Sequence, residues 1–134
     1  GLAIGDRVPA FSVAMSDGTT FSSNELQGKR GMIVFFNTEC PDCRRELPKM
    51  QQAYDRVKDD PGYKVICIAR EEEDEGIAAY WRENGLTLPY SPQSDRQVYN
   101  LFATVSIPRV YLTNRDLVIE AVYDDTTPFD PDNL

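Results

Sequence analysis

A continuously apolar run, residues 32–36, most constrains the fold, because two cysteines separated by two residues follow it closely. The run does not alternate apolar and polar side chains, which predicts a strand buried on both faces of a sheet. After the cysteines, apolar residues recur at helical spacing, so we predict a helix from Pro41 to about Lys58. Cys40 thus stands where a strand gives way to a helix. There, unpaired backbone N–H groups and the helix dipole favour a thiolate.

The motif Cys40-Pro41-Asp42-Cys43 therefore predicts thiol redox chemistry. Cys40 is the candidate nucleophile. Cys43 lies three residues on, on the same helix face, close enough to form a small disulfide ring and to resolve a mixed disulfide. Pro41 suits the first helical turn, where its missing N–H costs nothing.

Two other roles for the pair stay open at this point. A structural zinc site needs about four Cys or His ligands, and the chain offers one further cysteine, Cys67, and no histidine. A purely structural disulfide with this spacing would close a very short loop and stabilise the fold little. We therefore favour a redox-active disulfide between Cys40 and Cys43, and expect no other cofactor and no metal. Cys67 lies in an apolar run and is expected to be a small buried residue.

Length and charge limit the function further. The 134 residues suit one domain, residues 1–134, with enough chain for a hydrophobic core. The net charge of −8 argues against partners that need basic patches, such as nucleic acid and anionic membrane surfaces. No apolar stretch approaches the roughly 18 residues of a membrane span, and the first residues lack the pattern of a signal peptide.

The rest of the chain predicts alternating elements. An opening hairpin is expected at residues 11–21, followed by a short capped turn. Acidic residues 71–75 favour a solvated helix start over an acidic ligand site, and Gly85 ends that helix. A third helix at residues 95–102 is expected to pack through Val98, Leu101 and Phe102. Further strands are predicted at residues 63–69, 109–113 and 117–123. The order predicts an α/β fold with a mixed sheet and helices on its faces.

With the cysteines at the first helix start, the pattern resembles the three-layer thioredoxin-like fold with an added N-terminal hairpin. Residues 40–48 resemble the Cys-x-x-Cys-x-x-Glu-x-Pro pattern of the TlpA/ResA-like thiol-disulfide oxidoreductases. Residues 95–99 and 106–112 also look like family segments, so the similarity covers roughly residues 6–123. The resemblance implies dithiol exchange with protein clients, including apocytochromes before haem attachment. It also implies a periplasmic or membrane-tethered location outside the cytoplasm, with the targeting segment absent from this chain.

The resemblance implies further site residues. Pro108 matches the family's cis-proline, which faces the cysteine pair and leaves the backbone of Ile107 free to dock a substrate strand. The sequence itself leaves the isomer of Pro108 open. Glu46 matches the family's active-site acid, and its position on the face of Cys43 would let it accept the resolving thiol's proton. An exposed Glu46 without that role is the alternative.

Two departures from the family bear on these expectations. Glu39 replaces the usual Trp before the first cysteine, so Glu39 and Asp42 flank Cys40 with carboxylates. Their charges disfavour the thiolate, although Arg44 and Arg45 would offset part of the effect, and we hypothesise that the pair is a reductant. In addition, residues 124–134 form an acidic, proline-rich tail where the family adds a helix, and no full helix fits there.

Three functional hypotheses follow. The first is a thiol-disulfide oxidoreductase that reduces protein clients and is itself reduced by an upstream thiol donor, for which a membrane-embedded reductase is one candidate. The second is a peroxiredoxin-like peroxidase, although neither Cys40 nor Cys43 lies in a Pro-x-x-x-Thr-x-x-Cys pattern. The third is a non-catalytic thioredoxin-like binding module whose cysteines stay oxidised.

Overall fold

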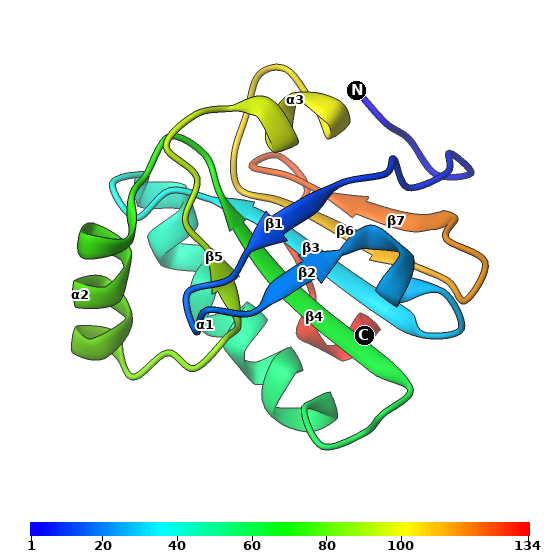
Figure 1. The fold of residues 1–134 in the computed structure, drawn as a ribbon, viewed down its shortest axis with the longest axis horizontal. Helices are drawn as coiled ribbons and strands as arrows, with labels where there is room; N and C mark the ends of the chain where they lie inside the picture. Colours follow the sequence, from blue (N-terminus) through cyan, green and yellow to red (C-terminus); the bar gives the residue numbers. More distant parts are fainter.

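A computed structural model describes all 134 residues and shows a mixed sheet of five strands in the order β5-β4-β3-β6-β7 (Figure 1). Pairing is parallel between β3 and β4 and between β4 and β5, and antiparallel from β3 to β6 and from β6 to β7. The predicted mixed sheet is confirmed. The strands are β3 (Arg30–Phe36), β4 (Tyr63–Ala69), β5 (Tyr90–Ser91), β6 (Arg109–Thr113) and β7 (Ile119–Tyr123).

Strand β3 is buried on both faces, as its unbroken apolar run predicts. Phe35 packs on one face, with its ring centroid 4.9 Å from that of Phe102 and 5.6 Å from that of Tyr99. Phe36 packs on the other face, 5.1 Å from the ring of Trp81. Successive residues of a strand point to opposite faces, so Phe35 and Phe36 pack the helices on the two faces against the sheet.

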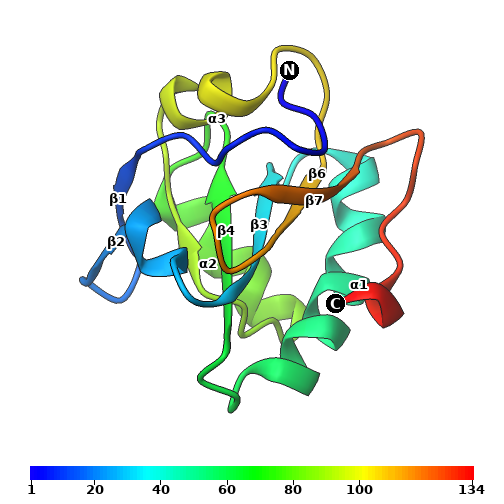
Figure 2. The same cartoon turned by 90° about the vertical axis from the view of Figure 1, so that its right-hand side faces the viewer.

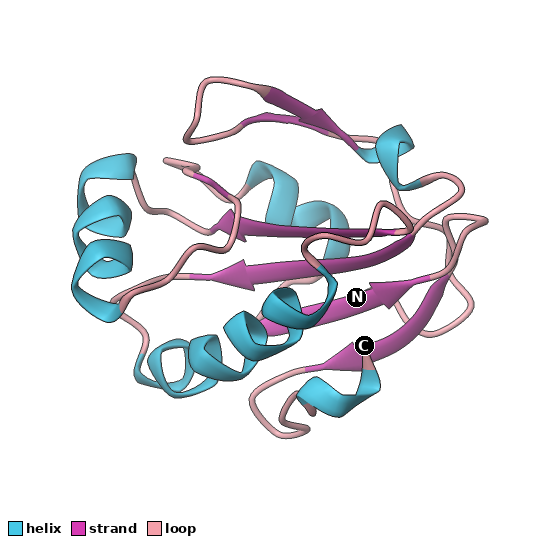
Figure 3. Ribbon diagram, turned by 90° about the horizontal axis from the view of Figure 1, so that it is seen from below, coloured by secondary structure: helices cyan, strands magenta, loops and turns pink.

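Helices and the hairpin complete three layers. Figure 2 shows α1 (Pro41–Val57) on one side of the sheet, and α3 (Gln97–Phe102) with the hairpin of β1 (Ser12–Ala14) and β2 (Thr20–Ser22) on the other. The short η1 (Ser23–Leu26) follows the hairpin, and α2 (Asp74–Asn84) ends at Gly85 as predicted. Figure 3 shows the helices around the sheet from below. The thioredoxin-like fold with an added hairpin is confirmed. No helix here has the length and apolar character needed to span a membrane.

Helix α3 corrects one expectation. Leu101 was predicted to pack inward, yet it is 45% exposed, whereas Tyr99 is 1% exposed. Tyr99 can be buried because its hydroxyl donates a hydrogen bond to the carbonyl of Ser106 at 2.7 Å. The helix also begins at Gln97, two residues later than predicted, where the Gln97 N–H donates to the Asp95 carboxylate.

The C-terminal tail packs on α1. After β7 the chain forms no further strand, and its one regular element is the 3-10 turn η2 (Pro131–Asn133). Phe129 is buried, with its ring 5.4 Å from that of Tyr123, and Arg56 of α1 forms an ion pair with Asp132 at 3.0 Å. The tail therefore lies on the α1 side of the sheet (Figure 2).

Candidate active site

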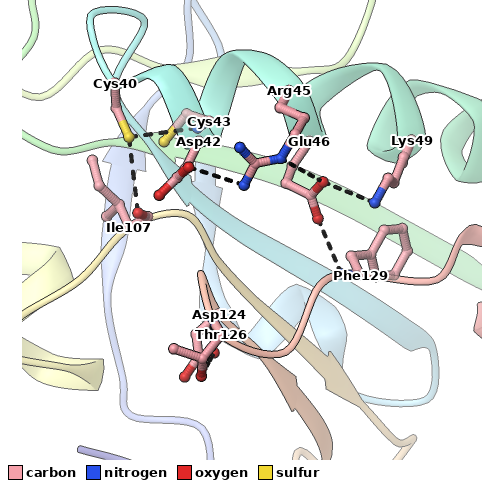
Figure 4. A network of polar contacts seen from close by, with 10 residues as sticks. All are labelled: Cys40, Asp42, Cys43, Arg45, Glu46, Lys49, Ile107, Asp124, Thr126 and Phe129. Atoms are coloured by element: carbon pink, nitrogen blue, oxygen red, sulfur yellow. Dashed lines mark hydrogen bonds and ion pairs between the residues drawn. The ribbon is translucent and has the colours of Figure 1, made fainter.

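The two motif cysteines share the first turn of α1. Cys40 is the N-cap residue in extended conformation, and its Sγ accepts a hydrogen bond from the Cys43 N–H at 3.4 Å (Figure 4). Pro41 fills the first helical position, as predicted. Cys40 is partly exposed, whereas Cys43 has no exposed surface. Cys40 is therefore the sulfur of the pair that a partner can reach.

Burial also changes the acidity of the two buried thiols, Cys43 and Cys67. Desolvation raises the pKa of Cys43 well above the ordinary thiol value, and a backbone hydrogen bond from Asn37 and the charge of Arg70 oppose this shift only in part. Cys67 lies in the core of β4, where burial likewise raises its pKa. Burial thus favours the protonated form of Cys43 at neutral pH, and Cys67 is a core residue as predicted.

The loop before β6 faces Cys40. The Ile107–Pro108 peptide bond is cis, so the structure decides the isomer that the sequence left open. The Cys40 thiol donates to the Ile107 carbonyl at 3.8 Å, and the Ile107 N–H has no hydrogen-bond partner within the protein. An open groove of about 560 Å³ runs between Cys40 and this loop, and Val105, 76% exposed, lines it.

The charged neighbours of Cys40 are arranged unequally. Asp42 forms an ion pair with Arg45 at 2.9 Å, which offsets its charge as expected (Figure 4). Arg44 instead donates to the Thr38 carbonyl. Glu39 is exposed and forms no ion pair, so its carboxylate is the uncompensated acidic charge next to the nucleophile.

Glu46 is buried at 2% exposure, so the exposed alternative is wrong. Its Oε1 accepts a hydrogen bond from the Phe129 N–H at 3.2 Å, and its Oε2 lies 2.8 Å from Lys49 Nζ (Figure 4). No hydrogen bond joins Glu46 to either cysteine in this state. The carboxylate therefore lies one helical turn beyond Cys43 and binds the C-terminal tail.

A second carboxylate, Glu72, supports the segment before Cys40. The Thr38 N–H donates to Glu72 Oε1 at 2.7 Å, and the Thr38 hydroxyl donates to Oε2. Glu72 belongs to the acidic run that was predicted to be a solvated helix start, and it departs from that prediction. No local sequence pattern predicts the contact between Thr38 and Glu72, because the two residues are 34 positions apart.

Comparisons with known proteins agree with this geometry. The model of the AhpC/TSA family matches residues 4–122. The thiol-disulfide oxidoreductase ResA of Bacillus thuringiensis (strain Al Hakam) is 24% identical over 127 residues, which cover 94% of this chain and 73% of ResA.

Solved structures give the same result. A thioredoxin family thiol:disulfide interchange protein from Chlorobium tepidum has a TM-score of 0.74 at 25% identity, with 95% of this chain and 93% of that one covered. StoA from Bacillus subtilis has a TM-score of 0.76 at 22% identity, with coverage of 94% and 93%. The chain belongs to the AhpC/TSA family and is a ResA/TlpA-like member of the thioredoxin superfamily, a thiol-disulfide oxidoreductase.

Proposed function

We propose that this protein reduces disulfides in protein clients through the Cys40–Cys43 dithiol, outside the cytoplasm. The observation that carries the proposal is the placement of a reachable Cys40, next to a fully buried Cys43, against the Ile107 carbonyl in a loop where the Ile107 N–H is unpaired. Such a site presents one sulfur and one docking backbone to an incoming chain. The activity shared by the named relatives supports the same reaction class.

The reaction consists of two exchange steps. The Cys40 thiolate attacks one sulfur of the client disulfide, a bond forms between Cys40 and that sulfur, and the other client sulfur leaves as a thiolate. The Cys43 thiolate then attacks Cys40 Sγ, which forms the Cys40–Cys43 disulfide and releases the second client thiolate. Two electrons pass to the client, and the two protons of the dithiol end on the client's thiols.

We propose that a client docks as an extended segment along the groove. The N–H of Ile107 can donate to a client carbonyl, as in the addition of a strand to an exposed backbone edge, and Pro108 fixes the loop that presents it. Glu46 is the candidate acceptor for the proton of Cys43, because it is the carboxylate one helical turn beyond that thiol. No additional cofactor enters this scheme.

The charges around Cys40 support a reducing role for the pair. The unpaired Glu39 carboxylate repels the negative charge of a reduced, ionised pair and not the neutral disulfide, which makes the reduced pair a better electron donor. An upstream thiol donor must then return two electrons to the Cys40–Cys43 disulfide after each turnover. A membrane-embedded reductase that delivers electrons from the cytoplasm would meet this need.

The redox potential of the pair tests the proposal first. The disulfide is equilibrated with glutathione or dithiothreitol buffers, and a potential below about −250 mV is the expected result. A potential above about −180 mV would instead assign the protein to oxidation or isomerisation of disulfides. Cys40→Ser must abolish reduction of a disulfide-bonded peptide, whereas Cys43→Ser must accumulate a mixed disulfide with it.

The two alternative functions are separated by the same variants. A non-catalytic binding module would retain its client in Cys40→Ser and show no turnover in the unaltered protein. A peroxidase would consume hydrogen peroxide in a Cys40-dependent reaction. The position three residues before Cys40 is occupied by Asn37, whose amide donates to the Arg70 carbonyl, and not by the threonine that the peroxidase pattern requires.

A further inference from the structure

Arg70 lines the active-site groove together with Cys40 and Ile107. It directly follows β4, and its N–H donates to the carbonyl of Phe36 at the end of β3, at 2.9 Å. Its own carbonyl accepts a hydrogen bond from the Asn37 side chain at 2.9 Å. The backbone of Arg70 is therefore fixed to the strand end that leads to Cys40.

The side chain of Arg70 reaches the opposite wall. Its guanidinium donates to the Val105 carbonyl at 3.1 Å and lies 4.9 Å from the ring centroid of Tyr99. The Tyr99 hydroxyl in turn donates to the carbonyl of Ser106, the next residue of the loop. Two consecutive carbonyls before Ile107 are thus held by one arginine and the aromatic ring on which it stacks.

Arg70 is also the one cation that lines the groove, where Glu39 and Glu71 supply the acidic side chains. The other arginines near the motif act elsewhere, because Arg45 pairs with Asp42 and Arg44 binds Thr38. The charge of Arg70 lowers the pKa of the Cys43 thiol, against the larger effect of burial, so it acts on the buried sulfur of the pair.

We propose that Arg70 is a positioning residue for dithiol exchange, which holds the docking loop before Ile107 across from Cys40 and places its positive charge in the groove that Cys40 lines. The inference rests on the proposed reduction of protein clients and adds a residue outside the cysteine motif to that mechanism. The two actions of Arg70 differ in their requirements. Docking needs the planar guanidinium, whereas thiolate stabilisation needs only a positive charge.

Three variants separate these actions. Arg70→Gln removes both, Arg70→Lys keeps the charge without the planar fork, and Arg96→Gln is the matched control. Arg96 also lies over the Tyr99 ring, at 5.4 Å, but it pairs with Glu71, and it is Arg70 that donates a hydrogen bond to the loop. Each variant is assayed with a peptide that contains one intrachain disulfide and with hydroxyethyl disulfide, which has no backbone to dock.

For Arg70→Gln we expect KM for the peptide to rise about 10-fold and alkylation of Cys40 by iodoacetamide at pH 7 to slow about 3-fold, in line with loss of a nearby charge. Arg70→Lys should raise KM for the peptide at least about 3-fold while alkylation and hydroxyethyl disulfide reduction stay within about 2-fold. Arg96→Gln should leave all three within about 2-fold. Thermal unfolding of each variant checks whether the protein remains folded.

The proposal is overturned if Arg70→Gln changes neither the peptide KM nor the alkylation rate, or if Arg96→Gln impairs both equally. A poorly folded Arg70→Gln leaves the decision to Arg70→Lys, whose unchanged KM would refute the docking role. Failure of the proposed function looks different. In that case the unaltered protein does not reduce the peptide at all, while the alkylation comparison still reports the effect of Arg70 on Cys40.

Discussion

The backbone N–H of Phe129 donates a hydrogen bond to the buried carboxylate of Glu46 at 3.2 Å. This contact joins the C-terminal tail to the helix that carries both cysteines, across 83 positions of sequence. Phe129 of the tail and Glu46 of the active-site helix therefore share a buried contact. The Phe129 ring adds to it by packing against Tyr123.

Loss of the Phe129 ring should destabilise the whole domain. Phe129 is 3% exposed, and truncation of a buried phenylalanine to alanine costs about 3–5 kcal/mol of unfolding free energy. We expect Phe129→Ala to lower stability to urea by about 3 kcal/mol. Asp125→Ala, at an exposed position of the same tail, should stay within about 0.5 kcal/mol. Equal stability of the two variants would show that the tail is only loosely attached.

Replacement of Glu46 by glutamine tests its proposed role as proton acceptor. The amide oxygen of the new side chain could still accept from the Phe129 N–H, so the tail contact persists while the basic carboxylate is lost. We expect Glu46→Gln to slow resolution of the mixed disulfide at least about 10-fold at pH 7, since a positioned base typically contributes about 100-fold or more. Rapid-quench measurement of the mixed disulfide reports this step. An unchanged resolution rate would restrict Glu46 to holding the tail.

The carboxylate of Glu72 should matter for both stability and activity. It receives two hydrogen bonds from Thr38, which is 2% exposed, two residues before the nucleophile. Glu72→Ala should cost about 1.5–3 kcal/mol, the usual range for hydrogen bonds to a charged group, and should lower the rate of client reduction. Glu73→Ala, one exposed residue later, is the control. If Glu72→Ala and Glu73→Ala lower the free energy of unfolding equally in urea, the contact between Glu72 and Thr38 does not stabilise the fold.

Stability of the reduced protein should fall at alkaline pH. Burial raises the pKa of Cys43 and of Cys67, and together with Asp74 it raises that of Tyr90 to about 12. The unfolded thiols lose their protons near pH 9.0, whereas the folded thiols keep them. Ionisation therefore stabilises the unfolded state relative to the folded state as the pH rises.

Above the pH at which the unfolded thiols ionise, each buried thiol should therefore lower the free energy of unfolding by about 1.4 kcal/mol per pH unit. Urea unfolding of reduced protein between about pH 9 and 11 measures the slope of the unfolding free energy against pH. Cys67→Ala should reduce the slope by the share of one thiol, whatever its effect on baseline stability. A slope that does not respond to this change would contradict the assignment.

Short-range patterns predicted the parts of the fold that depend on neighbours in sequence. The predicted strand at residues 63–69 coincides with β4, and the helix predicted to start at Pro41 does start there. In contrast, β5 has two residues and forms through pairing with β4, so its own sequence carries no strand pattern. Leu101 was misplaced because periodicity does not show that the hydroxyl of Tyr99 finds a buried acceptor.

The same division applies to the site. The motif located both cysteines, and the family resemblance pointed to Ile107, Pro108 and Glu46. The supporting contacts of Glu72 and Arg70 escaped prediction, because they join segments 34 and 35 positions apart and depend on how strand ends meet. An acidic run and a lone arginine are ordinary surface features until the fold brings them beside Thr38 and Val105.

The unequal exposure of the two motif sulfurs also limits oxidative damage. An oxidant from solution can react with Cys40 to form a sulfenic acid. Cys43, in the same helical turn, has no exposed surface and is protected from direct oxidation. That sulfenic acid has a thiol within the same helical turn, and condensation with it yields the disulfide. In the proposed mechanism this disulfide is the oxidised form of the dithiol, so stray oxidation would yield a state that the upstream thiol donor reduces.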